Sequence, residues 1–535
     1  MAIAFPALLL ALLLSSSHLP LSSPADEAFD VRRHLSTVTR YDVATEAYDG
    51  SFSPSTIHDG CRPIHLNLVA RHGTRAPTKK RIKELDRLAI RLDSLLSDAK
   101  QKAGKDSLQK IPAWLWGWQS PWKGRERGGE LISKGEEELY KLGTRVKERF
   151  PQLFDEEYHP DTFRIMATQV PRASASAVAF GMGIFAGRGS LGPGQHRSFS
   201  VISESRASDI HLRFFDTCKT YKGYFTHVII TFQEFRTSKE PDVEKMKEPI
   251  FDQIASSLSS RYHLNFTRQD ISTLWFLCKQ EASLLDITNQ ACGLFNPSEV
   301  SLLEWTDDIE VFVLKGYGES VNYRMGVPLL QDVVHSMEQV ISAEEVGFIV
   351  EIPGGTSEKA RLRFAHAETV VPFTCLLGLF LEGPEFEQIQ REQPLSLPPK
   401  PPQRRNWRGS SVAPFAGNNM LVLYQCPGNT SNDRLSSGVQ RNQYFVHVLH
   451  NEIPIPMPGC GQRDFCQFEV FKERIVNPHL KHDFNSVCGM KLKMPEANCP
   501  LQKPCSFTSK LSNLFSRFFP KKDHNPFIKN KKNEL

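Results

Sequence analysis

A short apolar run that ends abruptly in a cluster of charge constrains the fold of this chain more than any other feature of its sequence. The run spans residues 64–70, and its side chains Ile64, Leu66 and Leu68 alternate as they do in a pleated strand. The octet Arg-His-Gly-Thr-Arg-Ala-Pro-Thr follows directly at residues 71–78, where glycine and proline favour a loop. We therefore expect a buried strand with this octet at its carboxyl end, the edge at which open α/β sheets bind ligands.

The octet places His72 between Arg71 and Arg75. Two guanidinium groups beside an imidazole suit a small dianion, and a phosphoryl group is the natural ligand of such a site. The neighbouring positive charges should lower the imidazole pKa, which keeps a nitrogen lone pair available for attack on phosphorus. An arginine beside a histidine is a weak motif by itself, and a solvated basic loop around a packed histidine is the alternative.

A second strand with functional side chains at its end occurs much later in the chain. Residues 361–365 predict a strand, residues 366–368 read His-Ala-Glu, and residues 369–381 predict a buried apolar helix. In extended backbone, residues two apart project to the same side, so His366 and Glu368 can face one site. We expect one of them to hydrogen-bond phosphate and the other to give a proton to a leaving oxygen.

A third arginine stands in an electrostatically awkward position. Residues 163–168 predict a strand, and the helix expected after it begins with Pro171 and Arg172. A cation at a helix amino terminus is unfavourable unless an anion is bound there as well. Arg172 is therefore a candidate phosphate ligand.

Basic residues continue after the octet as Lys79, Lys80 and Arg81, at the start of a helical pattern. A solvated helix start is the simpler interpretation of such a run. Next to a phosphate site, however, Lys79 and Lys80 become candidates for holding a second phosphate. The tract at residues 315–318, Lys-Gly-Tyr-Gly, could line the same cleft or form an ordinary loop.

The octet resembles the signature of the histidine acid phosphatase superfamily. The resemblance implies that His72 is phosphorylated and that Arg71, Arg75 and Arg172 hold the phosphate. We expect His366 to join these arginines in binding phosphate and Glu368 to be the proton donor. The second tract more often reads His-Asp in that superfamily, and its His-Ala-Glu form resembles the multiple inositol polyphosphate phosphatase branch. Three further tracts resemble plant members of that branch, at residues 274–282, 304–308 and 315–318. The resemblance runs from about Cys61 to Cys488.

The resemblance implies an α/β fold, a mixed sheet flanked by helices as in the phosphoglycerate-mutase-like histidine phosphatases, with an inserted, mainly α-helical domain. A chain of 535 residues exceeds one typical core, which also favours an insertion. We expect the core at residues 26–208 and 332–505, the inserted domain at 209–331 and a basic tail at 506–535.

Local patterns predict three further elements. Ser133 and Glu136 have the spacing of a capping box before an amphipathic helix. The β-branched residues at 346–350 predict a return to strand. Residues 412–415, 419–424 and 444–449 predict late strands that return to the sheet.

The amino terminus indicates entry into the secretory pathway. Residues 1–25 combine a short apolar stretch with small residues before the expected cleavage site, which is typical of a signal peptide. Glycosylation sequons at Asn265 and Asn429 fit a secreted glycoprotein. The last four residues, Lys-Asn-Glu-Leu, resemble an endoplasmic-reticulum retrieval signal. We expect the endoplasmic reticulum, a vacuole or the extracellular space as the location.

The chain contains 11 cysteines, which suits an oxidising compartment. The resemblance implies the pairs Cys61 with Cys426, Cys218 with Cys488, Cys278 with Cys292, and Cys460 with Cys466. A local pair of Cys499 and Cys505 would leave Cys375 free in its apolar helix.

These observations lead to one expected function and three alternatives. We expect hydrolysis of phytate and lower inositol polyphosphates through a phosphohistidine, in a monomeric enzyme. A broad acid phosphatase, a bisphosphoglycerate phosphatase and an inositol-phosphate binding protein are the alternatives. The net charge of +5 is too small to indicate nucleic-acid binding, and no run is long enough to predict stable membrane insertion. The sequence has no evident metal-ligand cluster, and we expect neither metal nor cofactor, because the arginines can supply the positive charge.

Overall fold

The computed structural model of this protein describes residues 29–46, 52–102, 108–222, 235–349, 357–428 and 442–489. All of them belong to one of the two units into which internal contacts divide the chain, Met1–Gly489. The expected signal peptide, Asn429, Cys499, Cys505 and the tail at 506–535 lie outside the described residues.

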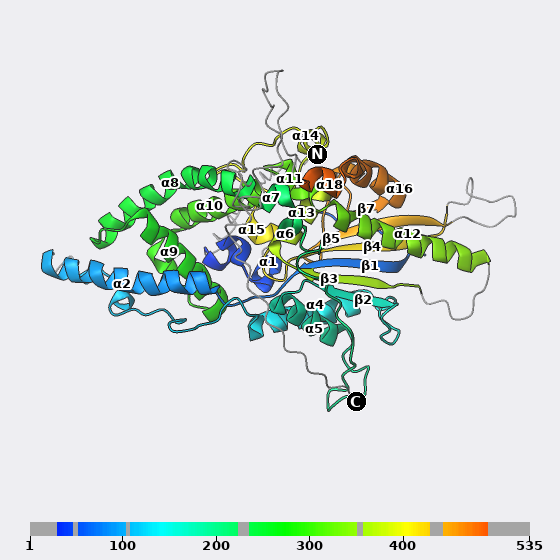
Figure 1. The fold of residues 1–535 in the computed structure, drawn as a ribbon, viewed down its shortest axis with the longest axis horizontal. Coiled ribbons are helices and arrows are strands. Elements are labelled where there is room, and N and C mark those ends of the chain that lie inside the picture. The colour runs from blue at the N-terminus through cyan, green and yellow to red at the C-terminus, as the bar shows by residue number, and fades with distance from the viewer. Residues whose placement is uncertain are drawn as a thin grey trace, which may run out of the picture. The chain divides into compact units, whose positions relative to one another are not determined.

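A mixed sheet of seven strands organises the described residues (Figure 1). Its strands follow the order β2 (Phe163–Ala167), β3 (Ala360–Ala365), β1 (Arg62–Arg71), β4 (Asn418–Cys426), β5 (Gln443–His450) and β6 (Ile453–Pro454), and β7 (Phe465–Gln467) pairs with β5. β3 is parallel to both β1 and β2, whereas β1 and β4 are antiparallel. The carboxyl ends of β1, β2 and β3 therefore meet at one edge. The expected mixed sheet flanked by helices is confirmed.

Helices cover both faces of this sheet (Figure 1). α4 (Ser133–Arg149) and α5 (Pro171–Ile184) share a hydrophobic cluster with Leu66 and Leu68 of β1. α12 (Val327–Ile349) and α13 (Ala367–Leu376) pack with Val69 on the opposite face. β1 is therefore buried on both sides, which fits a strand in the parallel part of a sheet.

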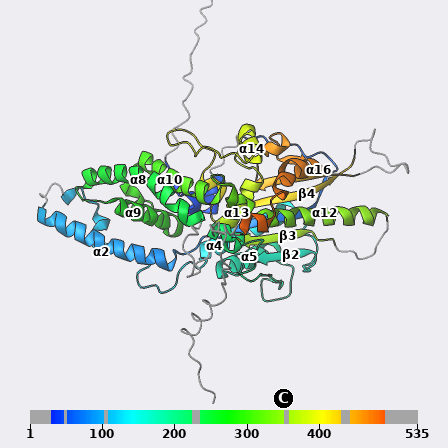
Figure 2. The same cartoon turned by 45° about the horizontal axis from the view of Figure 1, so that its top comes forward.

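Four long helices form a second group beside the sheet: α2 (Lys79–Lys102), α8 (Phe235–Tyr262), α9 (Arg268–Gln280) and α10 (Pro297–Lys315) (Figure 2). Their apolar side chains form a separate cluster that also contains Trp118 and Trp122. This cluster includes α2, which precedes the expected inserted domain, whereas residues 311–314 of α10 pack with the sheet. The boundaries 209–331 of an inserted domain therefore stay a proposal.

Shorter helices complete the described part of the chain. They are α1 (Tyr41–Glu46), α6 (Phe214–Thr217), α7 (Lys219–Lys222), α11 (Ser320–Arg324), α14 (Gly383–Gln390), α15 (Gly409–Val412), α16 (Phe468–Phe471), α17 (Asn477–Leu480) and α18 (Phe484–Cys488). None of the helices among the described residues is long and apolar enough to cross a membrane.

Two of the predicted strands are wrong. Residues 346–349 form the last turn of α12, because the apolar face that this helix packs on the sheet, from Leu330 to Val340, overrides the strand preference of β-branched residues. Val412 ends α15, and residues 413–415 form a loop rather than a strand. The carbonyl oxygen of Ala413 in that loop accepts a hydrogen bond from Arg71, so it is not free to join a sheet.

The predicted capping box is also wrong. Ser133 is the first residue of α4, and the N-cap residue is Ile132, whose side chain makes no capping hydrogen bond. The backbone of the octet meets this helix start instead, because Ile132 N donates to Thr74 O over 3.1 Å. A Cβ atom on Gly135 would lie 2.2 Å from Thr74 O, so this close approach requires glycine.

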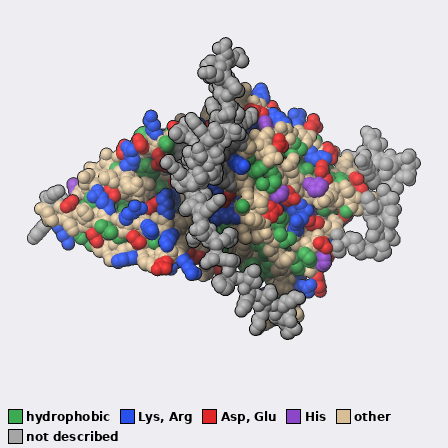
Figure 3. Space-filling view, in the orientation of Figure 1, with side chains coloured by type: hydrophobic (Ala, Val, Ile, Leu, Met, Phe, Trp, Pro, Cys, Tyr) green, Lys and Arg blue, Asp and Glu red, His purple; other side chains and the backbone are tan. Residues whose placement is uncertain are grey.

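Four disulfides are present among the described residues, and they are the four pairs that the resemblance implied. Cys375 is buried and unpaired, as expected. On the face drawn in Figure 3, basic and acidic side chains are interspersed, which accords with the small net charge of the chain.

Candidate active site

The three parallel strands bring the predicted residues to one edge of the sheet. Arg71 is the last residue of β1 and lies opposite Ala365, the last residue of β3. The backbone N–H of His72 then donates to Ala365 O over 3.0 Å. His366 follows β3 directly, and Thr168 follows β2 in the same way. The side chains after three strands therefore meet, although they are far apart in the sequence.

His72 is 3% exposed, and its ring is held in one tautomer. Nδ1 lies 2.9 Å from the carbonyl oxygen of Gly73. A carbonyl can only accept, so Nδ1 carries the hydrogen and Nε2 carries the lone pair. Burial, followed by the charge of Arg71, holds the pKa of His72 well below its ordinary value. The ring is therefore neutral, and Nε2 can act as a nucleophile.

Three arginines surround this histidine with positive charge. Nη1 of Arg71 donates to the carbonyl oxygens of Thr37 and Ala413, and its guanidinium lies 4.4 Å from the ring centroid of Phe415. Burial, followed by the charge of Arg75, lowers the pKa of Arg71 to about 9 and that of Arg172 to about 10. Arg75 thus lies close enough to Arg71 and Arg172 to disfavour the charge of both.

Each of these arginines also has an unsatisfied donor. The Nε–H groups of Arg71, Arg75 and Arg172 are buried and have no hydrogen-bond partner among the described residues. A buried donor without an acceptor costs about 1–3 kcal/mol. An anion that accepted from them would remove this cost, so the arrangement favours binding of a phosphate-like group.

His366 stands next to His72, with the two ring centroids 5.5 Å apart. Its Nε2 lies 2.9 Å from Oγ1 of Thr168 and 3.0 Å from Nη1 of Arg213, and its Nδ1 lies 3.5 Å from Nη2 of Arg172. Burial, followed by the charge of Arg172, lowers the pKa of His366 to about 3. His366 is therefore also neutral.

Glu368 approaches the same place from a helix, not from extended backbone as the sequence suggested. His366 is the extended N-cap of α13, and Glu368 lies in the first turn of that helix. Its carboxylate pairs with Nζ of Lys315 at 3.1 Å. Burial raises the pKa of Glu368, but the charge of Lys315 outweighs burial and holds this pKa well below its usual range.

Lys79 and Lys80 are the first residues of α2, and both are exposed. No contact between described residues joins either lysine to the buried cluster, so a role in holding a second phosphate stays a proposal. Their neighbour Arg81 pairs with Glu84 at 2.7 Å and covers the ring of Phe276.

The structure adds three residues that the sequence did not single out. Thr168 could have been found, because it follows a strand as His72 and His366 do. Arg213 lies 153 residues before His366, and no local motif marks it. Glu138 of α4 accepts from Thr74 N at 2.7 Å and from Thr74 Oγ1 at 2.8 Å, and so supports the octet.

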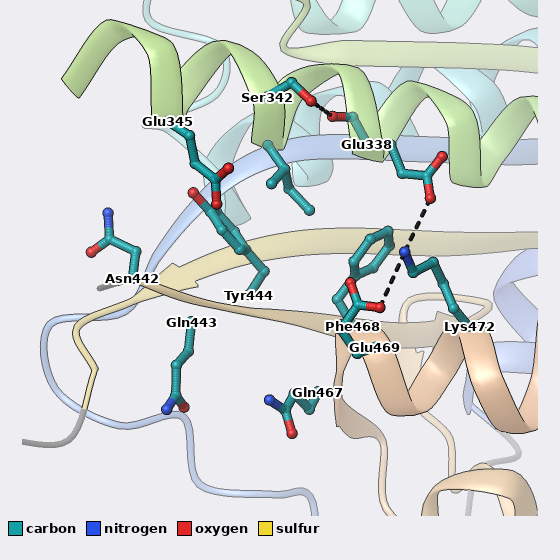
Figure 4. Close-up of a pocket in the computed structure, with 11 residues that line it drawn as sticks. Glu338, Ser342, Glu345, Asn442, Gln443, Tyr444, Gln467, Phe468, Glu469 and Lys472 are labelled. Atoms are coloured by element: carbon teal, nitrogen blue, oxygen red, sulfur yellow. Dashed lines mark hydrogen bonds and ion pairs between the residues drawn. The ribbon is translucent and has the colours of Figure 1, made fainter. Parts of the chain in front are cut away.

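A pocket on the far part of the sheet differs from this site in its charge. It has a volume of about 540 Å³ and lies among α12, β5, β7 and α16 (Figure 4). Glu338, Glu345 and Glu469 line it, and Lys472 is paired with two of these carboxylates, Glu338 at 3.1 Å and Glu469 at 3.2 Å. Carboxylates repel phosphate, so this pocket is no candidate for the same chemistry.

Comparisons with known proteins identify the family of this chain. Residues 64–451 match the family model of the histidine phosphatase superfamily (branch 2). The chain is 25% identical over 472 residues to multiple inositol polyphosphate phosphatase 1 of Dictyostelium discoideum, covering 80% of this chain and 68% of that protein.

Two solved structures have a similar fold. For the phytase from D. castellii the TM-score is 0.61 with 16% identity, covering 89% of this chain and 92% of that chain. For the Bifidobacterium longum multiple inositol polyphosphate phosphatase in complex with inositol hexasulfate, the TM-score is 0.55 with 18% identity, covering 84% and 98%. The family match extends from the strand of the octet past the His-Ala-Glu tract to the end of β5, and the chain therefore belongs to branch 2 of the histidine phosphatase superfamily.

Proposed function

We propose that this protein hydrolyses phytate and lower inositol polyphosphates through a phosphohistidine on His72. The observation that carries the proposal is a neutral, buried histidine enclosed by three arginines whose buried Nε–H groups lack acceptors among the described residues. Family membership supports the reaction type. The names of the relatives, multiple inositol polyphosphate phosphatase and phytase, support the substrate class.

The first step forms a bond between phosphorus and Nε2 of His72. Arg71, Arg75 and Arg172 neutralise the non-bridging oxygens, because phosphoryl transfer depends mainly on positioning and charge stabilisation. As the bond from phosphorus to the inositol oxygen breaks, Glu368 gives its proton to that oxygen, and the alcohol leaves.

The second step releases the phosphate. Glu368, now ionised, accepts a proton from a water molecule, and the water oxygen bonds to phosphorus while the bond to His72 breaks. Inorganic phosphate leaves, and both side chains return to their starting states. Because Lys315 holds the pKa of Glu368 low, the proton-donor form requires acidic solution, and the nearby negative charge of a bound phosphate favours that form further. An acidic pH optimum follows.

The number of phosphates on the substrate distinguishes a phytate phosphatase from the two alternative enzymes. Phytate carries several phosphates, so Lys79 and Lys80 at the exposed start of α2 would contact a second one. A broad acid phosphatase or a bisphosphoglycerate phosphatase would have less use for them. A binding protein would need the arginines but neither a nucleophile nor a proton donor.

We also propose that the chain passes through the secretory pathway as a glycoprotein and acts as a monomer. The four disulfides support an oxidising compartment, and Asn265 of the first sequon is exposed. The endoplasmic reticulum, a vacuole and the extracellular space are the compartments that the sequence leaves open.

Phosphate release from phytate between pH 4 and 7, with a chelator present, tests the function. We expect release by the wild type and by the control His482→Ala, whose side chain pairs with Glu392. We expect no release by a folded His72→Ala protein. Tight binding of phytate without release by the wild type would favour a binding protein instead.

A further inference from the structure

The contacts of His366 determine which of its nitrogens carries the hydrogen. Burial and Arg172 keep the ring neutral, and a neutral imidazole has one N–H and one lone pair. Nη1 of Arg213 lies 3.0 Å from Nε2. A guanidinium has donors only, so Nε2 must be the acceptor at this distance. Nδ1 is then the nitrogen that carries the hydrogen.

The other polar neighbours of His366 agree with this tautomer. Thr168 Oγ1, 2.9 Å from Nε2, can turn its hydrogen toward the same lone pair, since a hydroxyl both donates and accepts. On the other side, Nη2 of Arg172 lies at 3.5 Å from Nδ1, beyond an ordinary hydrogen-bond distance. The Nδ1–H and the Arg172 N–H are thus two donors at one place, and an anionic oxygen could accept from both.

Neighbouring side chains hold the guanidinium of Arg213 in place beside His366. It is 4% exposed, and its Nη2 donates to the carboxylate of Asp216 three residues later. Its guanidinium lies 5.1 Å from the ring centroid of Phe215. Asp216 is held in turn by Lys222 at 3.1 Å and by Arg206 at 3.5 Å. The side chain therefore has little freedom to turn away from His366.

We propose that Arg213 is a positioning residue that fixes His366 as the Nδ1–H tautomer, so that its single N–H is presented to a phosphate oxygen of the substrate. The catalytic part rests on the proposed function, whereas the tautomer itself does not. Without Arg213, Nε2 could carry the hydrogen and donate to Thr168. Nδ1 would then offer the phosphate a lone pair, which would repel an anionic oxygen.

The tautomer can be read directly by 15N NMR of protein labelled at histidine, since a protonated and an unprotonated ring nitrogen have well-separated shifts. His366→Gln identifies the signals of His366 by their loss. We expect Nδ1 to carry the hydrogen in the wild type and in Arg213→Lys, which keeps a donor. We expect Arg213→Met to shift the population toward Nε2–H. The matched control is Arg206→Met, because Arg206 pairs with the same Asp216 but makes no hydrogen bond with His366 among the described residues.

Kinetics then test the catalytic part on folded protein. Loss of one preorganised donor to the transition state should lower kcat in Arg213→Met by about 10²-fold with a smaller change in KM, and Arg213→Lys should recover part of it. A merely structural arginine would change the folded fraction and leave the tautomer and the kcat of the folded enzyme unchanged. If Arg213→Met does not fold, Arg213→Leu replaces it, because a leucine side chain also removes the donor to Nε2 and adds no acceptor.

Three results would overturn the proposal. They are an Nε2–H tautomer in the wild type, an unchanged tautomer in the Met or Leu variant, and a shifted tautomer with unchanged kcat. If the wild type releases no phosphate from phytate, the proposed function fails, while the NMR measurement still decides the tautomer.

Discussion

Glu138 gives the sharpest stability prediction, because its carboxylate satisfies buried donors of the octet from a neighbouring helix. It accepts from Thr74 N and Thr74 Oγ1 at 2.7 and 2.8 Å, and more weakly from Tyr41 N at 3.4 Å. Glu138→Ala leaves the two Thr74 donors buried without this acceptor. At about 1–3 kcal/mol for each donor, the expected loss in the free energy of unfolding is about 2–6 kcal/mol.

A conservative variant and a neighbouring control sharpen this prediction. In Glu138→Gln one amide oxygen can still accept from Thr74 N while the amide group donates to Oγ1, so the expected loss is smaller, about 1–2 kcal/mol. Glu137 lies next in the chain, and its carboxylate pairs with the exposed Lys141 one turn later. Glu137→Ala should therefore unfold at nearly the same urea midpoint as the wild type, because exposed ion pairs contribute little.

Urea unfolding followed by tryptophan fluorescence measures these differences, with phosphate release measured on the same preparations. We expect the order wild type, Glu137→Ala, Glu138→Gln and Glu138→Ala from most to least stable. We also expect activity to fall with the Glu138 variants, since the octet carries the nucleophile. Equal urea midpoints for Glu138→Ala and Glu137→Ala would refute the view that this carboxylate supports the octet.

Three further predictions concern charge. Burial raises the pKa of Glu281 to about 7, above its value of about 4.5 in the unfolded chain. The protonated carboxyl is therefore the form that stabilises the fold, and this stabilisation is complete below pH 4.5 and is lost as the pH rises through 7. The wild type should therefore lose about 3 kcal/mol of unfolding free energy between pH 4.5 and 7, whereas Glu281→Gln should not. Urea midpoints of both proteins between pH 4 and 8 measure this difference. Lys315→Met should raise the pKa of Glu368, so the alkaline limb of the kcat profile should move to higher pH; a shift to lower pH would contradict the pairing. Replacing Lys79 and Lys80 by alanine should raise KM for phytate and leave KM for a small phosphate monoester unchanged, whereas equal effects on both substrates would count against a second phosphate site.

The part of the site that the sequence could predict depends on short-range patterns. The apolar strand before the octet, and the strand before His366, place functional residues at strand ends by a general rule of α/β sheets. Arg172 was predicted because a cation at the amino terminus of a helix is unfavourable unless an anion binds beside it. In each case the relevant signal lies within a few residues of the functional side chain.

The rest depends on contacts that no local pattern contains. Arg213 reaches His366 across 153 residues, and Lys315 reaches Glu368 from the end of another helix. The last turn of α12 is helical because of its packing on the sheet, although residues 346–350 favour a strand locally. Ser133 is not an N-cap because the octet backbone packs against that helix start. These features follow from tertiary packing, which one sequence does not reveal.

Covalent phosphorylation of His72 is the central claim, and trapping the intermediate tests it most directly. Glu368→Gln should slow hydrolysis of the phosphohistidine, while p-nitrophenyl phosphate still reacts in the first step because its leaving group needs no proton. The reaction would be quenched in alkali, in which phosphohistidine survives, and the peptides examined by tandem mass spectrometry. We expect the phosphate on His72. Turnover by the wild type with phosphate on another residue, or with no phosphorylated residue in the trapped variant, would contradict it.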